Sequence, residues 1–144
     1  MRRQNSLRLA ALVAAALVAT ACSKPEDPAR NQEKVAEKIA EGQAKVDDTA
    51  AEAVRDHLDR VVDAEGKPLS EGDMKKDVDS LHKVDVELAD ANYEVAKKRC
   101  DTSTGDTKEQ CLATAKADHE AAIAAAAARK AGAKAEIEAV TPPQ

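Results

Sequence analysis

Large apolar residues recur every three or four positions, or at multiples of these steps, through long segments of the chain. This spacing puts them on one side of an α-helix, and no segment shows the apolar–polar alternation of a strand. The pattern predicts an all-α fold with an amphipathic helix over residues 31–65 and a helical hairpin over 73–132. The apolar positions of the first two helices are Val35, Ile39, Val46, Val54, Leu58 and Val61, then Met74, Val78, Leu81, Val84, Leu88, Ala91 and Val95.

Two clusters of helix-breaking residues separate the predicted helices. Gly66 and Pro68 follow the first helix, and residues 101–107 divide the hairpin. Residues 133–144 are expected to be a frayed helix end and a tail. In the first helix, Val35 and Val46 are eleven residues apart, a period that predicts a straight or slightly right-handed helix.

The first 21 residues have the pattern of a signal peptide. Arg2, Arg3 and Arg8 precede an uncharged, mostly aliphatic run over residues 9–21. That run is shorter than the roughly 20 apolar residues that a transmembrane helix needs. We therefore expect export followed by cleavage, with no membrane-spanning anchor in this segment.

Val18, Ala19, Thr20, Ala21 and Cys22 close this segment and resemble the lipobox of bacterial lipoproteins. The resemblance implies cleavage between Ala21 and Cys22 and acylation of the Cys22 thiol and amine, which gives a stable membrane anchor. Residues 22–30 hold two prolines among charges and are expected to form a flexible tether. Ser23 stands where Asp would favour the inner membrane in similar Gram-negative lipoproteins, which implies the periplasmic side of the outer membrane. The alternatives are the inner membrane or the free periplasm.

The composition after residue 21 predicts a small core. Leu, Ile and Val make up 18 of these 123 residues, there is no Phe, and Tyr93 is the only aromatic residue. This fraction lies beneath the roughly 20% at which globular packing becomes doubtful. Three arginines and no acid precede residue 22, so the net charge falls from -5 to -8 on cleavage. Such an acidic chain argues against a nucleic-acid partner.

Cys100 and Cys111 are the cysteines left once Cys22 is acylated. An oxidising periplasm permits a disulfide, and a helical hairpin with a loop of this size can bring the two Cα atoms within bonding range. The bond would stabilise the hairpin by about 3 kcal/mol in the chain-entropy model. A redox-active pair or a metal site is the alternative interpretation.

The three histidines do not form a recognisable metal-binding pattern. His57, His82 and His119 lie among charged residues, and no two of them are one helical turn apart. The sequence also lacks a nucleophile motif and a glycine-rich phosphate loop. We therefore expect no enzymatic activity, no cofactor and no metal.

The segment from Ala91 to Ala117 resembles a pattern in small exported proteobacterial lipoproteins of unknown role. The resemblance rests on the cysteine spacing within an Ala- and Lys-rich context and implies a disulfide-linked helical hairpin, without any activity. Together these observations predict a lipid-anchored envelope protein with a structural or protein-interaction role, whose partner is an envelope protein or a second copy. The alternative is a periplasmic carrier of a metal or an apolar ligand.

Overall fold

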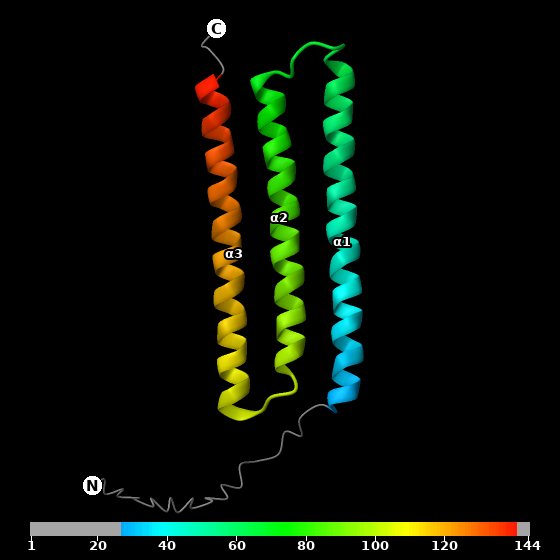
Figure 1. The fold of residues 1–144 in the computed structure, drawn as a ribbon, viewed down its shortest axis with the longest axis vertical. Coiled ribbons are helices and arrows are strands. Elements are labelled where there is room, and N and C mark those ends of the chain that lie inside the picture. Colours follow the sequence, from blue (N-terminus) through cyan, green and yellow to red (C-terminus); the bar gives the residue numbers. More distant parts are fainter. Residues whose placement is uncertain (1–26, 141–144) are drawn as a thin grey trace, which may run out of the picture.

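Three long helices lie side by side in a single flat layer (Figure 1). They are α1 (Pro28–Asp63), α2 (Glu71–Cys100) and α3 (Gly105–Val140). Successive helices run antiparallel, α2 lies in the middle, and α1 and α3 each contact α2 but not one another. The computed structural model describes residues 27–140, and within that range it confirms the all-α fold, without any strand.

The start of α1 lies a few residues before the position that the sequence pattern predicts. The Asp27 carboxylate accepts a hydrogen bond from the Ala29 backbone amide at 3.0 Å and so caps the helix. Pro28 occupies the first turn, where its missing N–H leaves no bond unmade. Pro28 therefore belongs to the helix, although the tether was expected to extend to residue 30.

The connection between α1 and α2 reverses the chain at two residues with left-handed backbone. Glu65 has φ 51° and Gly66 has φ 78°, so α1 ends at Asp63. Ser70 then caps α2, because its hydroxyl oxygen accepts a hydrogen bond from the Asp73 backbone amide at 3.1 Å.

The third helix continues through Gly132 to Val140, although residues beyond 132 were expected to fray. Ion pairs with α2 explain the additional turns. Lys134 lies 2.7 Å from Asp79, and Glu138 lies 2.6 Å from Lys75. These contacts hold the last turns of α3 against the start of α2.

The buried residues of the layer follow an eleven-residue spacing. Each helix has two buried residues, and in every helix the two are eleven positions apart. Eleven residues complete three turns when a helix has about 3.67 residues per turn, so such positions share one face of a straight helix. The helices can therefore stay in contact along their whole length without coiling around each other, as Figure 1 shows. The pairs are Asn31 and Gly42, Ala89 and Cys100, and Ala115 and Ala126.

Small side chains allow the helices to approach closely. A Cβ atom built on Gly42 would lie 2.8 Å from the Ala91 Cβ atom, so the backbone of α1 lies directly against α2. The buried apolar residues within the described range are Ala89, Cys100, Ala115 and Ala126. The small core that the composition predicts is thus a row of small residues.

Candidate interaction surface

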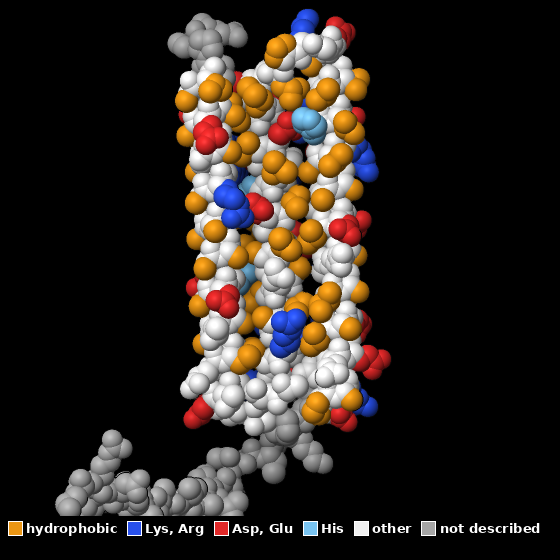
Figure 2. Space-filling model, in the orientation of Figure 1, with side chains coloured by type: hydrophobic (Ala, Val, Ile, Leu, Met, Phe, Trp, Pro, Cys, Tyr) orange, Lys and Arg blue, Asp and Glu red, His pale blue; other side chains and the backbone are white. Residues whose placement is uncertain are grey.

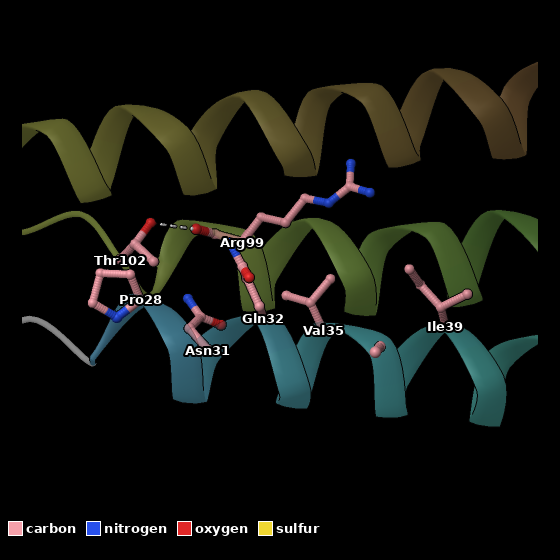
Figure 3. A pocket seen from close by; sticks show the side chains of 8 residues that line it. Pro28, Asn31, Gln32, Val35, Ile39, Arg99 and Thr102 are labelled. Atoms are coloured by element: carbon pink, nitrogen blue, oxygen red, sulfur yellow. Dashed lines mark hydrogen bonds between the residues drawn. The ribbon is translucent and has the colours of Figure 1, made fainter.

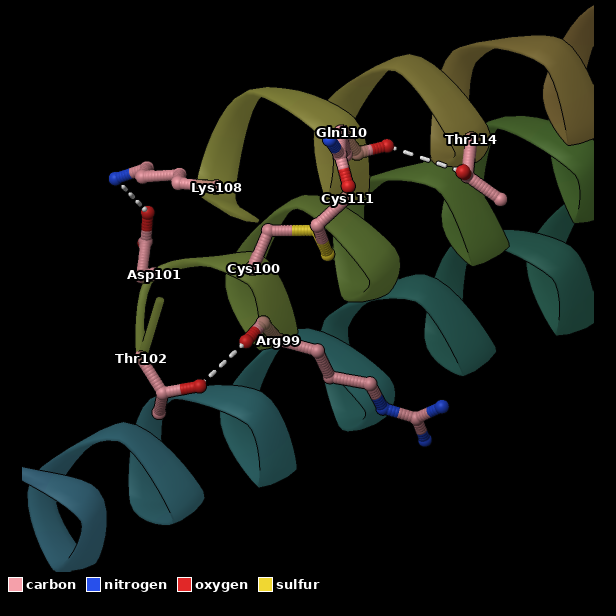
Figure 4. Close-up of a disulfide and its surroundings, with 8 residues drawn as sticks. All are labelled: Arg99, Cys100, Asp101, Thr102, Lys108, Gln110, Cys111 and Thr114. Atoms are coloured by element: carbon pink, nitrogen blue, oxygen red, sulfur yellow. Dashed lines mark hydrogen bonds and ion pairs between the residues drawn. A yellow bond between two sulfur atoms is a disulfide. The ribbon is translucent and has the colours of Figure 1, made fainter. Parts of the chain in front are cut away.

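The two cysteines of the hairpin form the disulfide that the sequence predicts. The Cα atoms of Cys100 and Cys111 are 5.7 Å apart, and the bond joins the end of α2 to the second turn of α3 (Figure 4). This distance lies within the roughly 4.4–6.8 Å of ordinary disulfides. Ala21 and Cys22, the predicted cleavage and acylation site, lie outside the described residues.

Asp101 strengthens the same loop through two ion pairs. Its carboxylate lies 2.7 Å from the Lys98 ammonium group. It also lies 2.9 Å from the ammonium group of Lys108, a contact that Figure 4 shows. Hydrogen bonds from these two lysines lower the pKa of Asp101. The disulfide and the ion pairs therefore fix the loop end of the α2–α3 hairpin from two sides.

Two of the three histidines make ion pairs between helices, whereas the buried Nδ1 atom of His82 has no hydrogen-bond partner within residues 27–140. His57 of α1 lies 2.8 Å from Asp77 of α2, and His119 of α3 lies 2.6 Å from Asp90 of α2. The His119 ring also stacks on Tyr93, with ring centres 4.8 Å apart. Among residues 27–140, no three His, Cys, Asp or Glu side chains are placed to hold a metal ion.

The main candidate site is an apolar surface along the junction of α1 and α2. We call it the apolar face. Its large side chains are more than two-fifths exposed at six positions, in particular Leu81 at 62% and Val54 at 58%. Figure 2 shows apolar side chains along most of this junction. The face comprises Val35, Ile39, Val46, Val54, Leu58 and Val61 of α1 and Leu81, Val84, Leu88 and Val95 of α2.

Two open hollows follow the apolar face. One, of about 410 Å³, lies between Val54 and Leu81 and is lined almost entirely by apolar atoms. The other, of about 580 Å³, lies between Ile39 and Leu88 and includes the Arg99 side chain. Together they form a groove wide enough to receive side chains from another molecule.

The opposite side of the same two helices is charged. Around Gly42 and Ala91 it presents three charged residues of α1, Lys38, Glu41 and Lys45, and three acids of α2, Glu87, Asp90 and Glu94. Lys38 donates a hydrogen bond to Glu41 at 2.5 Å, and this bond lowers the pKa of the Glu41 carboxyl group. The α1–α2 pair therefore has one apolar side and one charged side.

The sequence pattern identified the residues of the apolar face but not their exposure. Apolar positions at helical spacing normally face a core. Here the helices contact one another through small residues such as Gly42 and Ala91. The larger apolar side chains lie next to these contacts and remain partly exposed. Asn31 and Arg99, which line a third hollow at the loop end of the groove, were not singled out in the sequence. The eleven-residue spacing from Asn31 to Gly42 was a usable signal.

Comparison of the chain with protein-family models, curated proteins and solved structures gave no match in any of the three. Within residues 27–140, no helix is both long and apolar enough to span a bilayer.

Proposed function

We propose that this chain is a lipid-anchored protein of a bacterial envelope with a structural, protein-interaction role, and that its apolar face packs against a second copy. The observation that carries the proposal is the contrast between the two sides of α1 and α2. One side exposes large aliphatic residues such as Leu81 and Leu88, and the other is charged. Contiguous apolar surface of this kind marks interaction sites on soluble domains.

The size of the apolar face supports a second copy as its occupant. The face runs for about 40 Å from Val35 to Val61 and is about 20 Å wide, given the rise and diameter of α-helices, or about 800 Å². A stable dimer buries about 800 Å² on each partner. Two identical faces that meet around a two-fold axis would cover both sets of aliphatic residues at once.

Sedimentation equilibrium of the full chain, purified as the host cell processes it, tests self-association. We expect a dimer, and we expect the Leu81→Glu variant to be monomeric because it places a charge inside the interface. Val62→Glu is the matched control, since Val62 is 73% exposed on α1 outside the apolar face. A wild-type chain that stays monomeric at every concentration would exclude the second copy as occupant.

Acylation at Cys22 is the second part of the proposal. It is supported by the lipobox-like residues before it and by the basic and apolar pattern of residues 2–21. Mass spectrometry of the N-terminal peptide should give a mature chain that begins at Cys22 and carries acyl chains, and Cys22→Ser should move the protein from the membrane fraction to the soluble one. An unmodified mature N-terminus would contradict the anchor. Separation of the two membranes by density tests the proposed outer-membrane location.

A carrier of an apolar ligand is the second candidate function. The hollow of about 410 Å³ between Val54 and Leu81 favours it, because this volume lies within the range of small-molecule sites. Dodecanoate should then raise the thermal midpoint of the Leu81→Ala variant less than that of the wild type, since a ligand bound by the native state stabilises it. A midpoint that dodecanoate leaves unchanged in both proteins would remove this candidate.

A further inference from the structure

The side-chain amide of Asn31 is buried without hydrogen bonds at the loop end of the groove. The residue is 2% exposed, and among residues 27–140 neither its side-chain nitrogen nor its side-chain oxygen has a hydrogen-bond partner. Leaving such a group unpaired in the interior is unfavourable, and most buried side-chain amides have a partner. An apolar residue in the first turn of α1 would avoid this penalty. The presence of Asn31 therefore suggests that its amide pairs with another molecule.

The unpartnered amide lines a hollow of about 470 Å³ between the start of α1 and the end of α2. Figure 3 shows the Asn31 amide between the two helices, near Pro28, Gln32 and Thr102. Val35, Ala36 and Ile39 give the rest of the hollow an apolar lining.

Arg99 adds a positive charge to this hollow. Its guanidinium group makes no ion pair with any residue of the described range 27–140. Figure 3 shows the side chain leaving the Asn31 end and running along α2, and Arg99 also lines the adjoining hollow beside Leu88. The hollow therefore has the neutral amide of Asn31, which can donate and accept hydrogen bonds, at one end. The positively charged guanidinium group of Arg99 lies further along α2.

These groups define the chemistry of a ligand. A side-chain amide offers one acceptor and two donors, which match the C=O and N–H groups of a peptide backbone. A guanidinium group binds a carboxylate through paired hydrogen bonds. Small apolar side chains fit against Val35 and Ile39, and the volume is in the range of small-molecule sites.

We propose that this hollow binds a short peptide with a free carboxylate: a backbone amide pairs with Asn31, the carboxylate with Arg99, and small apolar side chains pack on Val35 and Ile39. This inference goes beyond the proposed function. It uses the loop end of the apolar face, where a second copy packed on Val35 and Ile39 would compete with the peptide.

The test titrates the isotope-labelled full chain, purified as cells process it, with a pool of N-acetylated tripeptides of Ala, Val and Leu that carry a free carboxylate. The side-chain NH₂ signals of Asn31 should shift in a saturable manner. The same pool with amidated C-termini should bind about tenfold more weakly, because it lacks the partner of Arg99. The monomeric Leu81→Glu variant should bind the acid pool at least as tightly as the wild type, because no second copy competes for Val35 and Ile39, and it should keep the same preference for the acid over the amide. This separates peptide binding from self-association.

Two variants with matched controls identify the contacts by calorimetry. Asn31→Leu should lose binding about tenfold or more while its thermal midpoint rises, because an apolar residue replaces an unpaired amide. Arg99→Gln should bind the acid and amide pools equally. Two changes at exposed positions away from the hollow are the controls: Gln110→Leu also replaces an amide side chain by leucine, and Arg55→Gln repeats the arginine change. Both should leave binding unchanged.

Three results would each overturn the peptide site. They are Asn31 signals that do not shift in either pool, an Asn31→Leu variant that binds as tightly as the wild type, and an amidated pool that binds as tightly as the acid pool. A rise in thermal midpoint for Asn31→Leu without loss of binding would make Asn31 a structural residue only.

Discussion

Gly42 determines how closely α1 and α2 approach. A Cβ atom at this position would lie 2.8 Å from the Cβ atom of Ala91, which is fixed to the α2 backbone and cannot rotate away. Any side chain at residue 42 would therefore push the two helices apart. Gly132 of α3 is different, because nothing lies within 4 Å of the position that its Cβ atom would take.

The same substitution at these two glycines should have opposite effects. Gly42→Ala should lower the free energy of unfolding by about 1 kcal/mol, because overpacking outweighs the gain in helix propensity. Gly132→Ala should raise it by about 0.5–1 kcal/mol, because alanine favours the helix and meets no neighbour. Urea unfolding followed by circular dichroism measures both. Equal stabilisation of the two variants would contradict the close approach at Gly42.

At the residue scale, the sequence predicted the chemistry that depends on local spacing. The Cys100–Cys111 bond could be predicted because both cysteines flank one loop. The burial of Asn31 and Gly42 could not, because it depends on which residue of α2 lies opposite each of them. A polar residue and a glycine give no hydrophobic signal, and only their eleven-residue spacing marks them as one contact row.

At the element scale, α2 supplies the acids of most ion pairs that hold the layer together. Asp77 contacts His57 and Arg60 of α1, while Asp79, Asp85 and Asp90 contact bases of α3. Charges of opposite sign on facing helices oppose sliding, which the small buried residues resist only weakly. The sequence predicted the helices and their stripes from periodicity, but charge alternation along one helix does not say which neighbour it faces.

The ion pairs of Asp79 make the free energy of unfolding depend on pH. Hydrogen bonds from Lys134 and Lys130 lower the pKa of Asp79 to about 2. A carboxyl group whose pKa is lower in the folded state stabilises the fold above its unfolded pKa of about 3.9, and this contribution is lost as the pH falls towards its folded pKa. The free energy of unfolding should therefore decrease between about pH 4 and about pH 2.

The Asp79→Asn variant should show a flatter decrease over the same pH range, measured by thermal unfolding at each pH. Asp118→Asn is the control, because Asp118 is exposed on α3 and has no ion pair with another residue of the described range. An unchanged pH profile for Asp79→Asn would show that its ion pairs add nothing to stability.

The disulfide stabilises the packing of α3 on α2 and leaves the contact between α1 and α2 unaffected. Replacing both Cys100 and Cys111 by serine should lower the free energy of unfolding by about 3 kcal/mol in the chain-entropy model. Because α3 contacts only α2 within the described range, we expect α3 amides to exchange faster while amides of α1 near Gly42 keep their protection. Hydrogen exchange with mass spectrometry measures both helices. A reductant should reproduce the effect in the wild type and add nothing to the double variant.

At the scale of the whole molecule, the helices form a layer and not a bundle. Periodicity and loop length predict the number and order of the helices. A flat layer and a three-helix bundle are equally compatible with that number and order. The difference lies in the angle between the two contact rows of α2. Ala91 meets Gly42 of α1, and Cys100 is bonded to Cys111 of α3. Nine residues separate Ala91 from Cys100, which puts them on opposite sides of the helix. The hydrophobic periodicity of α2 marks one apolar side of the helix, so it does not reveal a second contact row.

Small-angle X-ray scattering distinguishes the layer from a bundle. We expect a particle thickness of about 10 Å, the diameter of one helix, whereas a three-helix bundle would be about 20 Å thick. The measurement should use the Leu81→Glu variant at low concentration, so that association through the apolar face does not add a second layer. A thickness close to that of a bundle would contradict the separation of α1 from α3.

The eleven-residue spacing also makes the length of this protein adjustable in fixed steps. Insertion of eleven residues at the same height in each helix would return every following side chain to its original face and would lengthen the layer by about 16 Å. The apolar and charged sides would keep their registration, and Cys100 would still meet Cys111. If a membrane anchor precedes α1, each such insertion would move the α1–α2 loop about 16 Å further from the membrane. The distance that the protein spans could then change in evolution while every contact between helices stays the same.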